Sequence, residues 1–305
     1  MIIRNFEYLL ALNQERHFAR AAAACQVSQP TLSSGIKQLE EDMDVLIVKR
    51  GQRFEGFTEE GARVLLLAQQ MLEDCQRLKQ ELRDLRGPGL QGPFRIGMSP
   101  STAAVVSVLS VSFAEQFPLL QISSTTASCE ELMQQLRQGE LDIALTHLEP
   151  ALHEGLETHA LYDERLFLLT SDKAHKERVS WEQAAASPLC LLRGAIPAPA
   201  QTRLEHAPKL MVTDAVPMVA AHLATKKWAT VLPQSLVSQV ATAQTVAIPL
   251  SPPDNRINIG FVTQKKAALP PAIHAMMELA HTPEMVTAIR ALLAAHRAFR
   301  AKPTR

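Results

Sequence analysis

Hydrogen-bonding side chains gather on one face of the stretch SQPTLSSGIKQLEEDM, residues 28–43. Its apolar residues recur at helical spacing and predict a helix with one narrow buried stripe, formed by Leu32, Ile36, Leu39 and Met43. The opposite face carries an amide, a proline, short hydroxyls and one cation, on Gln29, Pro30, Thr31, Ser33, Ser34 and Lys37. Such groups can reach base edges in a major groove, and a lysine can meet a phosphate. Spacing alone is equally compatible with an ordinary solvated face.

Two helices are expected ahead of this stretch, at about residues 3–14 and 18–26. The second is rich in alanine and therefore thin enough for another helix to cross it closely. Ser28 is a good N-cap and Pro30 is tolerated in a first turn, so the helix at 28–43 begins sharply after a tight turn. Gly35 is expected to let a backbone approach the helix. The arrangement predicts a helix-turn-helix.

A basic segment follows, because residues 44–61 predict two short strands joined by a glycine turn that carry Lys49, Arg50 and Arg53. Residues 1–90 hold 12 Lys and Arg against 13 Asp and Glu, so attraction to phosphates rests on this wing and Lys37. We expect modest non-specific DNA affinity with a strong salt dependence.

Residues 58–86 predict a long helix, capped by Thr58 and ended by the GPG sequence at 87–89. Its apolar residues alternate by three and four over more than three repeats, at Val64, Ala68, Met71, Cys75, Leu78, Leu82 and Leu85. The seam can pack on the protein's own core or on a second copy. Pairing in a homodimer is the simpler interpretation, because the helix ends in a glycine- and proline-rich hinge.

From residue 93 the pattern changes to alternating strands and helices. Strands are expected at 94–99, 120–126 and 141–148, with helices near 102–117 and 129–138, which predicts a βαβαβ order in an α/β domain. Ligands in such sheets bind beyond the carboxyl ends of strands. Six polar residues are candidates for binding a small carboxylate or related anion: Ser99, Ser101, Thr102, Ser128, Thr146 and Arg193. Plain N-capping is the alternative role for each hydroxyl.

Composition limits the class of protein. A chain of 305 residues with 47% hydrophobic content is expected to form more than one domain, and its zero formal net charge excludes a globally polycationic binder. Cys25, Cys75, Cys129 and Cys190 lie far apart without metal-ligand spacing, which favours a reduced compartment and no metal. Without a signal peptide or a membrane span, the protein is expected in the cytoplasm. No catalytic motif is present, so neither an enzyme nor a cofactor is expected.

The run HFARAAAACQVSQPTLSSGIKQLEEDMDVLIVKRGQRFEGFTEEG resembles the winged helix-turn-helix of LysR-type transcriptional regulators, and RQGELDIAL resembles their effector-binding region. The resemblance spans nearly the whole chain. It implies a DNA-binding domain at 1–58, a linker and dimerisation helix with a hinge at 59–90, and a periplasmic-binding-protein-like effector domain at 91–305. Subdomain I would comprise 91–163 and 264–305, and subdomain II 164–263, with crossings near 164–169 and 261–265.

The resemblance also implies double-stranded promoter DNA, a small-molecule effector and a homodimer or homotetramer as partners. Ser34 departs from the family pattern, in which arginine is frequent there. Two alternatives remain. In one, the regulator senses oxidants through a thiol, with Cys129 activated at a helix start or Cys75 bridging two subunits, although a buried apolar role is the simpler one for both. In the other, the chain binds a small molecule and no DNA.

Overall fold

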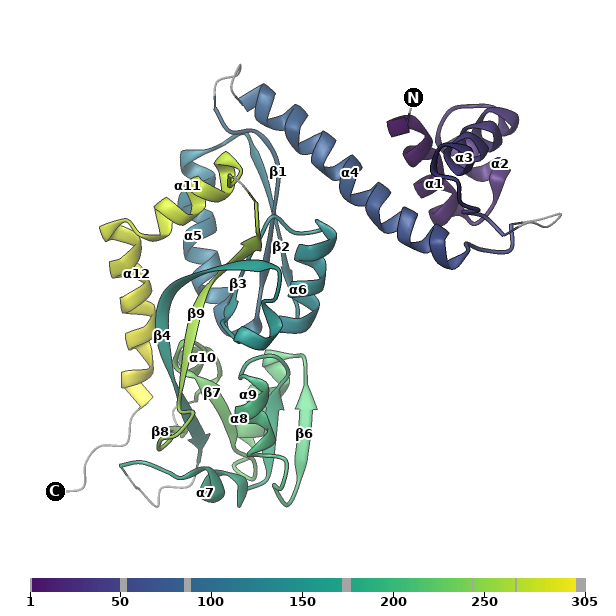
Figure 1. Ribbon diagram of the computed structural model, residues 1–305. Coiled ribbons are helices and arrows are strands. Elements are labelled where there is room, and N and C mark those ends of the chain that lie inside the picture. The colour runs from purple at the N-terminus through teal and green to yellow at the C-terminus, as the bar shows by residue number, and fades with distance from the viewer. Residues whose placement is uncertain are drawn as a thin grey trace. The chain divides into compact units, whose positions relative to one another are not determined.

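A computed structural model describes residues 2–49, 54–84, 89–171, 177–242, 244–266 and 268–299. The chain divides into two compact units, Met1–Pro88 and Gly89–Arg305 (Figure 1). Each unit has its own apolar core, as expected for a chain of this length. In the described residues, no helix is both long enough and apolar enough to cross a membrane.

The first unit is helical. Its helices are α1 (Ile2–Glu15), α2 (Phe18–Ala24), α3 (Gln29–Met43) and α4 (Glu59–Asp84). The Ser28 hydroxyl accepts a hydrogen bond from the Thr31 N–H at 3.3 Å and so caps α3, while Asp44 ends this helix in a left-handed conformation with φ 52°. Thr58 caps α4 by accepting from the Gly61 N–H at 2.9 Å. Both predicted caps are therefore present.

Leu32, Ile36 and Leu39 are buried, which confirms most of the predicted stripe, whereas Met43 is exposed. Leu32 and Ile36 pack with α1 and with Ala21 and Ala22 of α2. Gly35 was expected to let a backbone approach the helix, whereas side chains of α1 lie against it. A Cβ at this position would lie 2.7 Å from Tyr8 Cδ2 and 2.8 Å from Asn5 Oδ1, so the glycine lets α1 cross α3 closely.

The second unit is an α/β structure. Its strands are β1 (Gly92–Met98), β2 (Leu120–Thr126), β3 (Ile143–His147), β4 (Leu156–Thr170), β5 (Leu189–Leu192), β6 (Leu210–Thr213), β7 (Thr230–Pro233), β8 (Val246–Pro249) and β9 (Arg256–Gln264). Its α-helices are α5 (Ala103–Gln116), α6 (Cys129–Gln138), α7 (Trp181–Ala185), α8 (Ala198–Thr202), α9 (Val216–Ala224), α10 (Gln234–Val240), α11 (Pro271–Ala280) and α12 (Pro283–Ala294). Three 3-10 helices are η1 (Pro100–Thr102), η2 (Pro150–Leu152) and η3 (Ala295–Phe299).

Strand β4 joins two parts of the sheet whose strand order is β2-β1-β3-β9-β4-β7, with β8 also paired to β4. Its first part pairs with β9 up to Arg165, and its last part pairs with β7 and β8 from Leu166 onward. This change of partners lies within 164–169, where the first crossing between subdomains was predicted, and the subdomain bounds stay a prediction. The predicted return near 261–265 is too late, because β9 already pairs with β4 at Arg256 and with β3 from Ile259. The short β5 and β6 form a separate parallel pair.

Candidate DNA-binding and effector sites

The polar face of α3 is open to solvent. Gln29, Pro30, Thr31, Ser34 and Lys37 are exposed and Ser33 is half-buried. The first turn of the helix contains no acidic residue, whereas Glu41 and Asp42 lie near its end. Lys37 Nζ lies 3.5 Å from Glu41 Oε1, both largely exposed. The positive end of the helix dipole and the uncharged polar groups therefore occupy the same half of α3, which is the half suited to an anionic partner.

The segment after α3 is held to the helical core by specific contacts. Glu40 Oε1 accepts hydrogen bonds from the Ile47 and Val48 N–H groups at 2.8 and 2.9 Å. The two predicted strands reduce to one antiparallel bridge between Val48 and Phe57. Lys49 is exposed beside this bridge, while the predicted contacts Arg50 and Arg53 lie outside the described residues. The wing is thus positioned from α3 itself.

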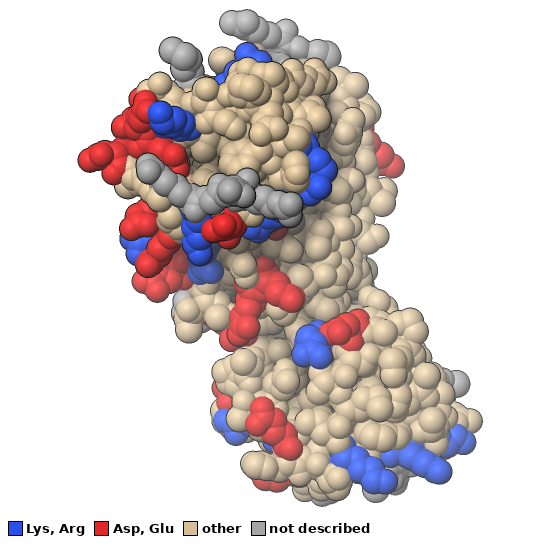
Figure 2. Space-filling model, turned by 90° about the vertical axis from the view of Figure 1, so that its right-hand side faces the viewer, with Lys and Arg blue, Asp and Glu red and all other residues tan. Residues whose placement is uncertain are grey.

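Charge is mixed on the molecular surface. In Figure 2, Lys and Arg side chains are interspersed with Asp and Glu on the face toward the viewer. This distribution agrees with 31 basic and 31 acidic residues in the whole chain. Any attraction to DNA phosphates must therefore come from a small number of lysine and arginine side chains at specific positions.

Helix α4 has two different apolar faces. Ala68 is fully buried and Val64 partly buried against Phe6, Leu9 and Ile47, so the predicted seam is wrong for these two residues, which belong to the core of their own unit. Farther along, the side chains of Leu67, Met71, Leu78 and Leu82 are 58, 49, 56 and 44% exposed. Cys75 is half-buried, and Leu85 lies outside the described residues. The face available to another helix is therefore shorter than predicted and begins near Leu67.

The candidate effector loop after β1 is buried and internally bonded. Ser99, Ser101 and Thr102 are fully buried. The Ser99 and Ser101 hydroxyl oxygens lie 2.9 Å apart, and the Thr102 hydroxyl donates to the Leu145 carbonyl oxygen at 2.7 Å. Neither Ser99 nor Thr102 caps the following helix with its hydroxyl. Plain N-capping therefore does not explain these side chains.

Ser128 and Thr146 have different environments. Ser128 forms a capping box with Glu131 at the start of α6, where both its N–H and its hydroxyl donate to Glu131 Oε2 at 2.9 and 2.8 Å. These bonds lower the pKa of Glu131. Thr146 is fully buried on β3, where its hydroxyl interacts with the Cys129 thiol and partly offsets the rise in the pKa of that thiol. N-capping thus accounts for Ser128 and not for Thr146.

The loop at 193–202 reaches two of these candidate positions. Gly194, with φ 68°, lies so close that a Cβ there would be 3.3 Å from Ser128 Cα and 3.6 Å from Pro100 Cδ. Arg193 is exposed, and its Nε donates to Asp214 Oδ1 at 2.7 Å. The structure therefore brings the β1, β2 and β5 loops together, and Arg193 has a carboxylate partner at the same edge.

The sequence did not single out a cluster of titratable groups after β3. His147 Nε2 lies 2.8 Å from Glu149 Oε1, and this contact lowers the pKa of Glu149, helped by the Ala198 N–H at the start of α8. His153 is buried nearby, and desolvation lowers its pKa. The polar run THLEP directly after a buried strand was the available signal. Within the described residues, no cluster of His, Cys, Asp and Glu is arranged to hold a metal.

Three of the cysteines are poor thiolates. Burial raises the pKa of Cys129 to about 11 and also raises the pKa values of Cys25 and Cys190. The Cys129 thiol donates to the His147 carbonyl oxygen at 3.7 Å, and α6 begins at this residue without activating it. Cys25 is half-buried against the helix-turn-helix core. These thiols resemble structural cysteines rather than reactive ones.

Comparison with protein families agrees with this arrangement. The model of the bacterial regulatory helix-turn-helix protein, lysR family, matches residues 3–62, and the model of the LysR substrate binding domain matches residues 87–282. The chain belongs to the LysR family. Both predicted regions, the helix-turn-helix and the α/β effector-binding region, are therefore confirmed.

Two curated relatives carry names of regulators rather than of enzymes. The hydrogen peroxide-inducible genes activator of Haemophilus influenzae is 32% identical over 195 residues, which cover 64% of this chain and 62% of that protein. The DNA-binding transcriptional dual regulator OxyR of Escherichia coli is 33% identical over 196 residues, covering 63% and 64%. The chain thus spans just under two thirds of the length of these LysR-family relatives.

Solved structures extend the similarity over nearly the whole chain. A full-length OxyR variant from Pseudomonas aeruginosa is 26% identical, covers 98% of each chain and has a TM-score of 0.62. Full-length CbnR complexed with its target DNA is 22% identical, covers 92% of this chain and 98% of that chain, and also has a TM-score of 0.62. The second comparison supports the fold alone.

Proposed function

We propose that this LysR-family chain is a DNA-binding transcriptional regulator whose DNA contacts change when a small anionic effector binds to its α/β unit. The DNA-binding part of the proposal rests on the first half of α3, which contains no acidic residue and whose polar face is exposed. In that proposal, Gln29, Pro30, Thr31, Ser33 and Ser34 contact base edges and sugar-phosphate groups. Lys37 and the wing residues Lys49, Arg50 and Arg53 neutralise phosphates.

The effector would bind where the β1, β2 and β5 loops meet. Ser99, Ser101, Thr102, Ser128, Thr146 and Arg193 are the proposed contacts. The buried Thr146 hydroxyl, which caps no helix, and the uncapped turn at η1 support an anion or carboxylate. Arg193 would exchange its Asp214 partner for the ligand. Because Gly194 contacts both Pro100 and Ser128, a ligand here would alter the spacing of loops on either side of the β4 crossing.

The proposed assembly is a homodimer through α4, with a homotetramer as the larger form. Support comes from the exposed apolar side chains of Leu67, Met71, Leu78 and Leu82, which repeat at helical spacing along one face. A dimer would present two α3 helices to two DNA half-sites.

A footprint of the purified protein on the DNA upstream of its own coding sequence, repeated at several salt concentrations, tests the DNA-binding proposal. Protection of two helically phased half-sites, weakening steeply with salt, is expected. No protection at low salt on that DNA or on other promoter fragments would contradict it and leave the small-molecule-binding alternative. A panel of small carboxylates added to the protected complex then tests the effector, with a changed footprint or bend as the expected response.

Peroxide sensing is the second candidate because the Haemophilus influenzae relative is named a hydrogen peroxide-inducible genes activator. The raised pKa values of Cys25, Cys129 and Cys190 argue against it for this chain, since the thiolate is the form that reacts with peroxide. We therefore propose a ligand-responsive regulator in preference to a thiol-based one.

A further inference from the structure

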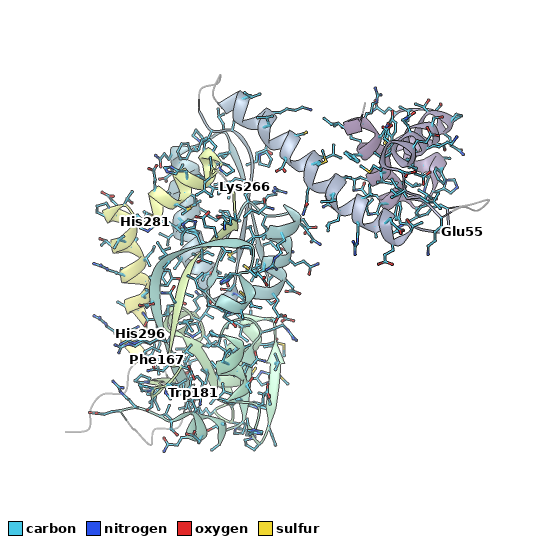
Figure 3. The ribbon with its side chains drawn as sticks, in the orientation of Figure 1. Glu55, Phe167, Trp181, Lys266, His281 and His296 are labelled. Carbon is cyan, nitrogen blue, oxygen red and sulfur yellow. The ribbon has the colours of Figure 1, made fainter. Side chains whose placement is uncertain are left out.

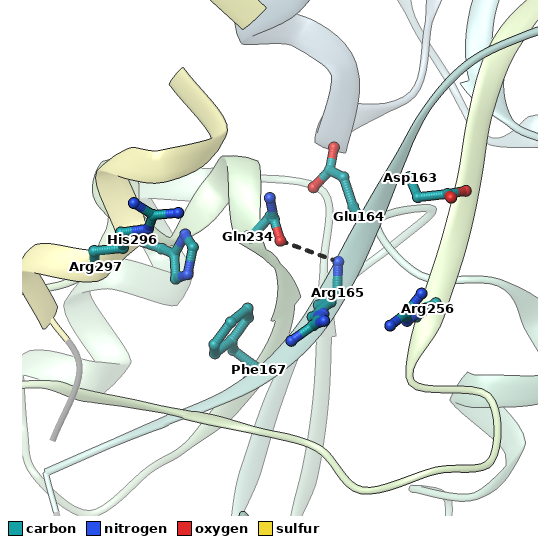
Figure 4. Close-up of a pocket in the computed structure, with 8 residues that line it drawn as sticks. All are labelled: Asp163, Glu164, Arg165, Phe167, Gln234, Arg256, His296 and Arg297. Carbon is teal, nitrogen blue, oxygen red and sulfur yellow. Dashed lines mark hydrogen bonds between the residues drawn. The ribbon is translucent and has the colours of Figure 1, made fainter. Parts of the chain in front are cut away.

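A pocket of about 350 Å³, lined by none of the proposed effector contacts, lies where β4, β9, α10 and η3 meet. Figure 4 shows the side chains around it, including Arg165 of β4, Arg256 of β9 and Arg297 of η3. This volume is near the lower end of the range of about 300–1,000 Å³ typical of small-molecule sites. Arg297 lies beyond residue 282, the last residue matched by the LysR substrate binding domain model.

Among the described residues, the cations of this pocket have no counter-ion. Arg165 and Arg256 face each other as direct partners in the antiparallel β4–β9 ladder, a position in which like charges destabilise the pair. In the described part of the chain, the guanidinium groups of Arg165, Arg256 and Arg297 make no recorded ion pair or hydrogen bond. Because these guanidinium groups repel one another in the absence of a ligand, binding of a negatively charged molecule is favourable.

The acidic groups that line the pocket are already bonded to other residues. The Asp163 carboxylate accepts from the Asn258 side-chain amide at 2.9 Å. Glu164 is buried and accepts from the Ser235 N–H at 3.0 Å. Neither carboxylate forms an ion pair with the three arginines among the described residues. The net charge offered to a ligand is therefore positive.

The rest of the lining is packed against or bonded to neighbouring elements. The Phe167 and His296 rings lie 4.8 Å apart between centroids, as their adjacent positions in Figure 3 also show, and they fasten η3 to β4. His296 Nδ1 lies 2.6 Å from the Leu293 carbonyl oxygen, and Gln234 Oε1 accepts from the Arg165 N–H at 3.2 Å. A bound anion would thus find its cations on fixed elements, which lowers the entropic cost of binding.

We propose that this pocket binds a small anion with two or more negative charges, held by Arg165, Arg256 and Arg297. Guanidinium groups bind carboxylate and phosphate oxygens through paired hydrogen bonds, so di- and tricarboxylates and phosphates share the required chemistry. None of the three arginines is a proposed effector contact, and the proposal does not depend on DNA binding.

Calorimetric titration of the full chain with citrate and, separately, with inorganic phosphate tests the proposal at low ionic strength. Saturable binding of at least one probe is expected. Binding of citrate alone would indicate a carboxylate ligand, and binding of phosphate alone would indicate a phosphate ligand. Arg165→Gln and Arg256→Gln should each weaken it by roughly tenfold or more, the loss expected for one charge-assisted contact. Arg290→Gln, which removes an exposed arginine of α12 outside the pocket, should leave binding unchanged.

Two further readouts keep the outcome decisive. Arg193→Gln should not affect binding, because Arg193 belongs to the proposed effector loops. Without anion, Arg256→Gln should melt at the same temperature as the unmodified protein or higher, since it removes a like-charge pair. The proposal is overturned if neither probe binds at up to about 10 mM, or if Arg193→Gln or Arg290→Gln abolishes binding while the pocket variants retain it.

Discussion

The Ser235 hydroxyl donates a hydrogen bond to the Ser101 carbonyl oxygen at 2.8 Å, joining the start of α10 to the turn after β1. The N–H of the same residue donates to Glu164 Oε2 at 3.0 Å on β4. All three residues are buried. One serine therefore connects the crossing strand, a helix beyond the crossing and the proposed effector loop, so any change in their spacing must stretch or break one of these bonds.

Ser235→Ala should lower the free energy of unfolding by about 1–3 kcal/mol, because it leaves the buried Ser101 carbonyl without its hydroxyl donor. Chemical denaturation measures the loss. Ser238→Ala is the matched control, since it removes an exposed hydroxyl from the same helix and should change stability by less than about 0.5 kcal/mol. Equal stability of the two variants would show that the Ser235 bond contributes nothing.

Glu164 should make stability depend on pH. Burial raises the pKa of this carboxyl to about 7. A carboxyl with a raised pKa stabilises the fold most below its unfolded pKa of about 4.3, and this contribution is lost as the pH rises through the folded pKa. The Glu164→Gln variant cannot ionise, so its stability relative to the unmodified protein should increase between about pH 4.3 and pH 7 and level off above pH 7, by up to about 1.4 kcal/mol per unit of pKa shift.

Denaturation curves at several pH values measure this difference. Glu154→Gln is a suitable control, because Glu154 lies just before β4 and is exposed. Parallel stability curves for Glu164→Gln and the unmodified protein would mean that Glu164 is ionised at neutral pH in spite of its burial.

Local patterns predicted α3 closely, because its apolar stripe, its N-cap Ser28 and its early proline all lie within the helix itself. The same reasoning assigned Val64 and Ala68 to a dimer seam. Periodicity identifies a face that must be covered but not what covers it, and here α1 and α3 of the same unit do so. The contact of Ala198 with Glu149 was not predictable, because it joins segments that only the tertiary fold brings together.

Peroxide should leave DNA protection by this protein unchanged. Cys129 and Cys190 are buried, and the thiolate population at neutral pH is small where burial raises the pKa, to about 11 for Cys129. Alkylation at pH 7 followed by mass spectrometry should label both residues much faster in the unfolded chain than in the folded one. If peroxide altered the footprint of the unmodified protein but not that of Cys129→Ser, the result would instead support thiol sensing.

Leu78→Glu should weaken the proposed dimer, because it places a charge in the exposed apolar face of α4. Sedimentation at several protein concentrations should show a shift toward monomer. Leu210→Glu, at a residue of β6 that is 40% exposed, introduces the same charge outside α4 and should leave the oligomer intact. An unchanged oligomer in Leu78→Glu would place the dimer contact elsewhere.

Ser34→Arg should tighten DNA binding and make it more sensitive to salt. Ser34 is exposed on α3, in the half of the helix without acidic residues, so an arginine there can reach a phosphate without a competing internal partner nearby. One additional phosphate contact should steepen the plot of log affinity against log salt by about one. Ser107→Arg adds the same charge to an exposed position of α5 and should leave the slope unchanged. Equal slopes for the two variants would mean that Ser34 does not face DNA, and the contact surface would then have to lie on another face of α3.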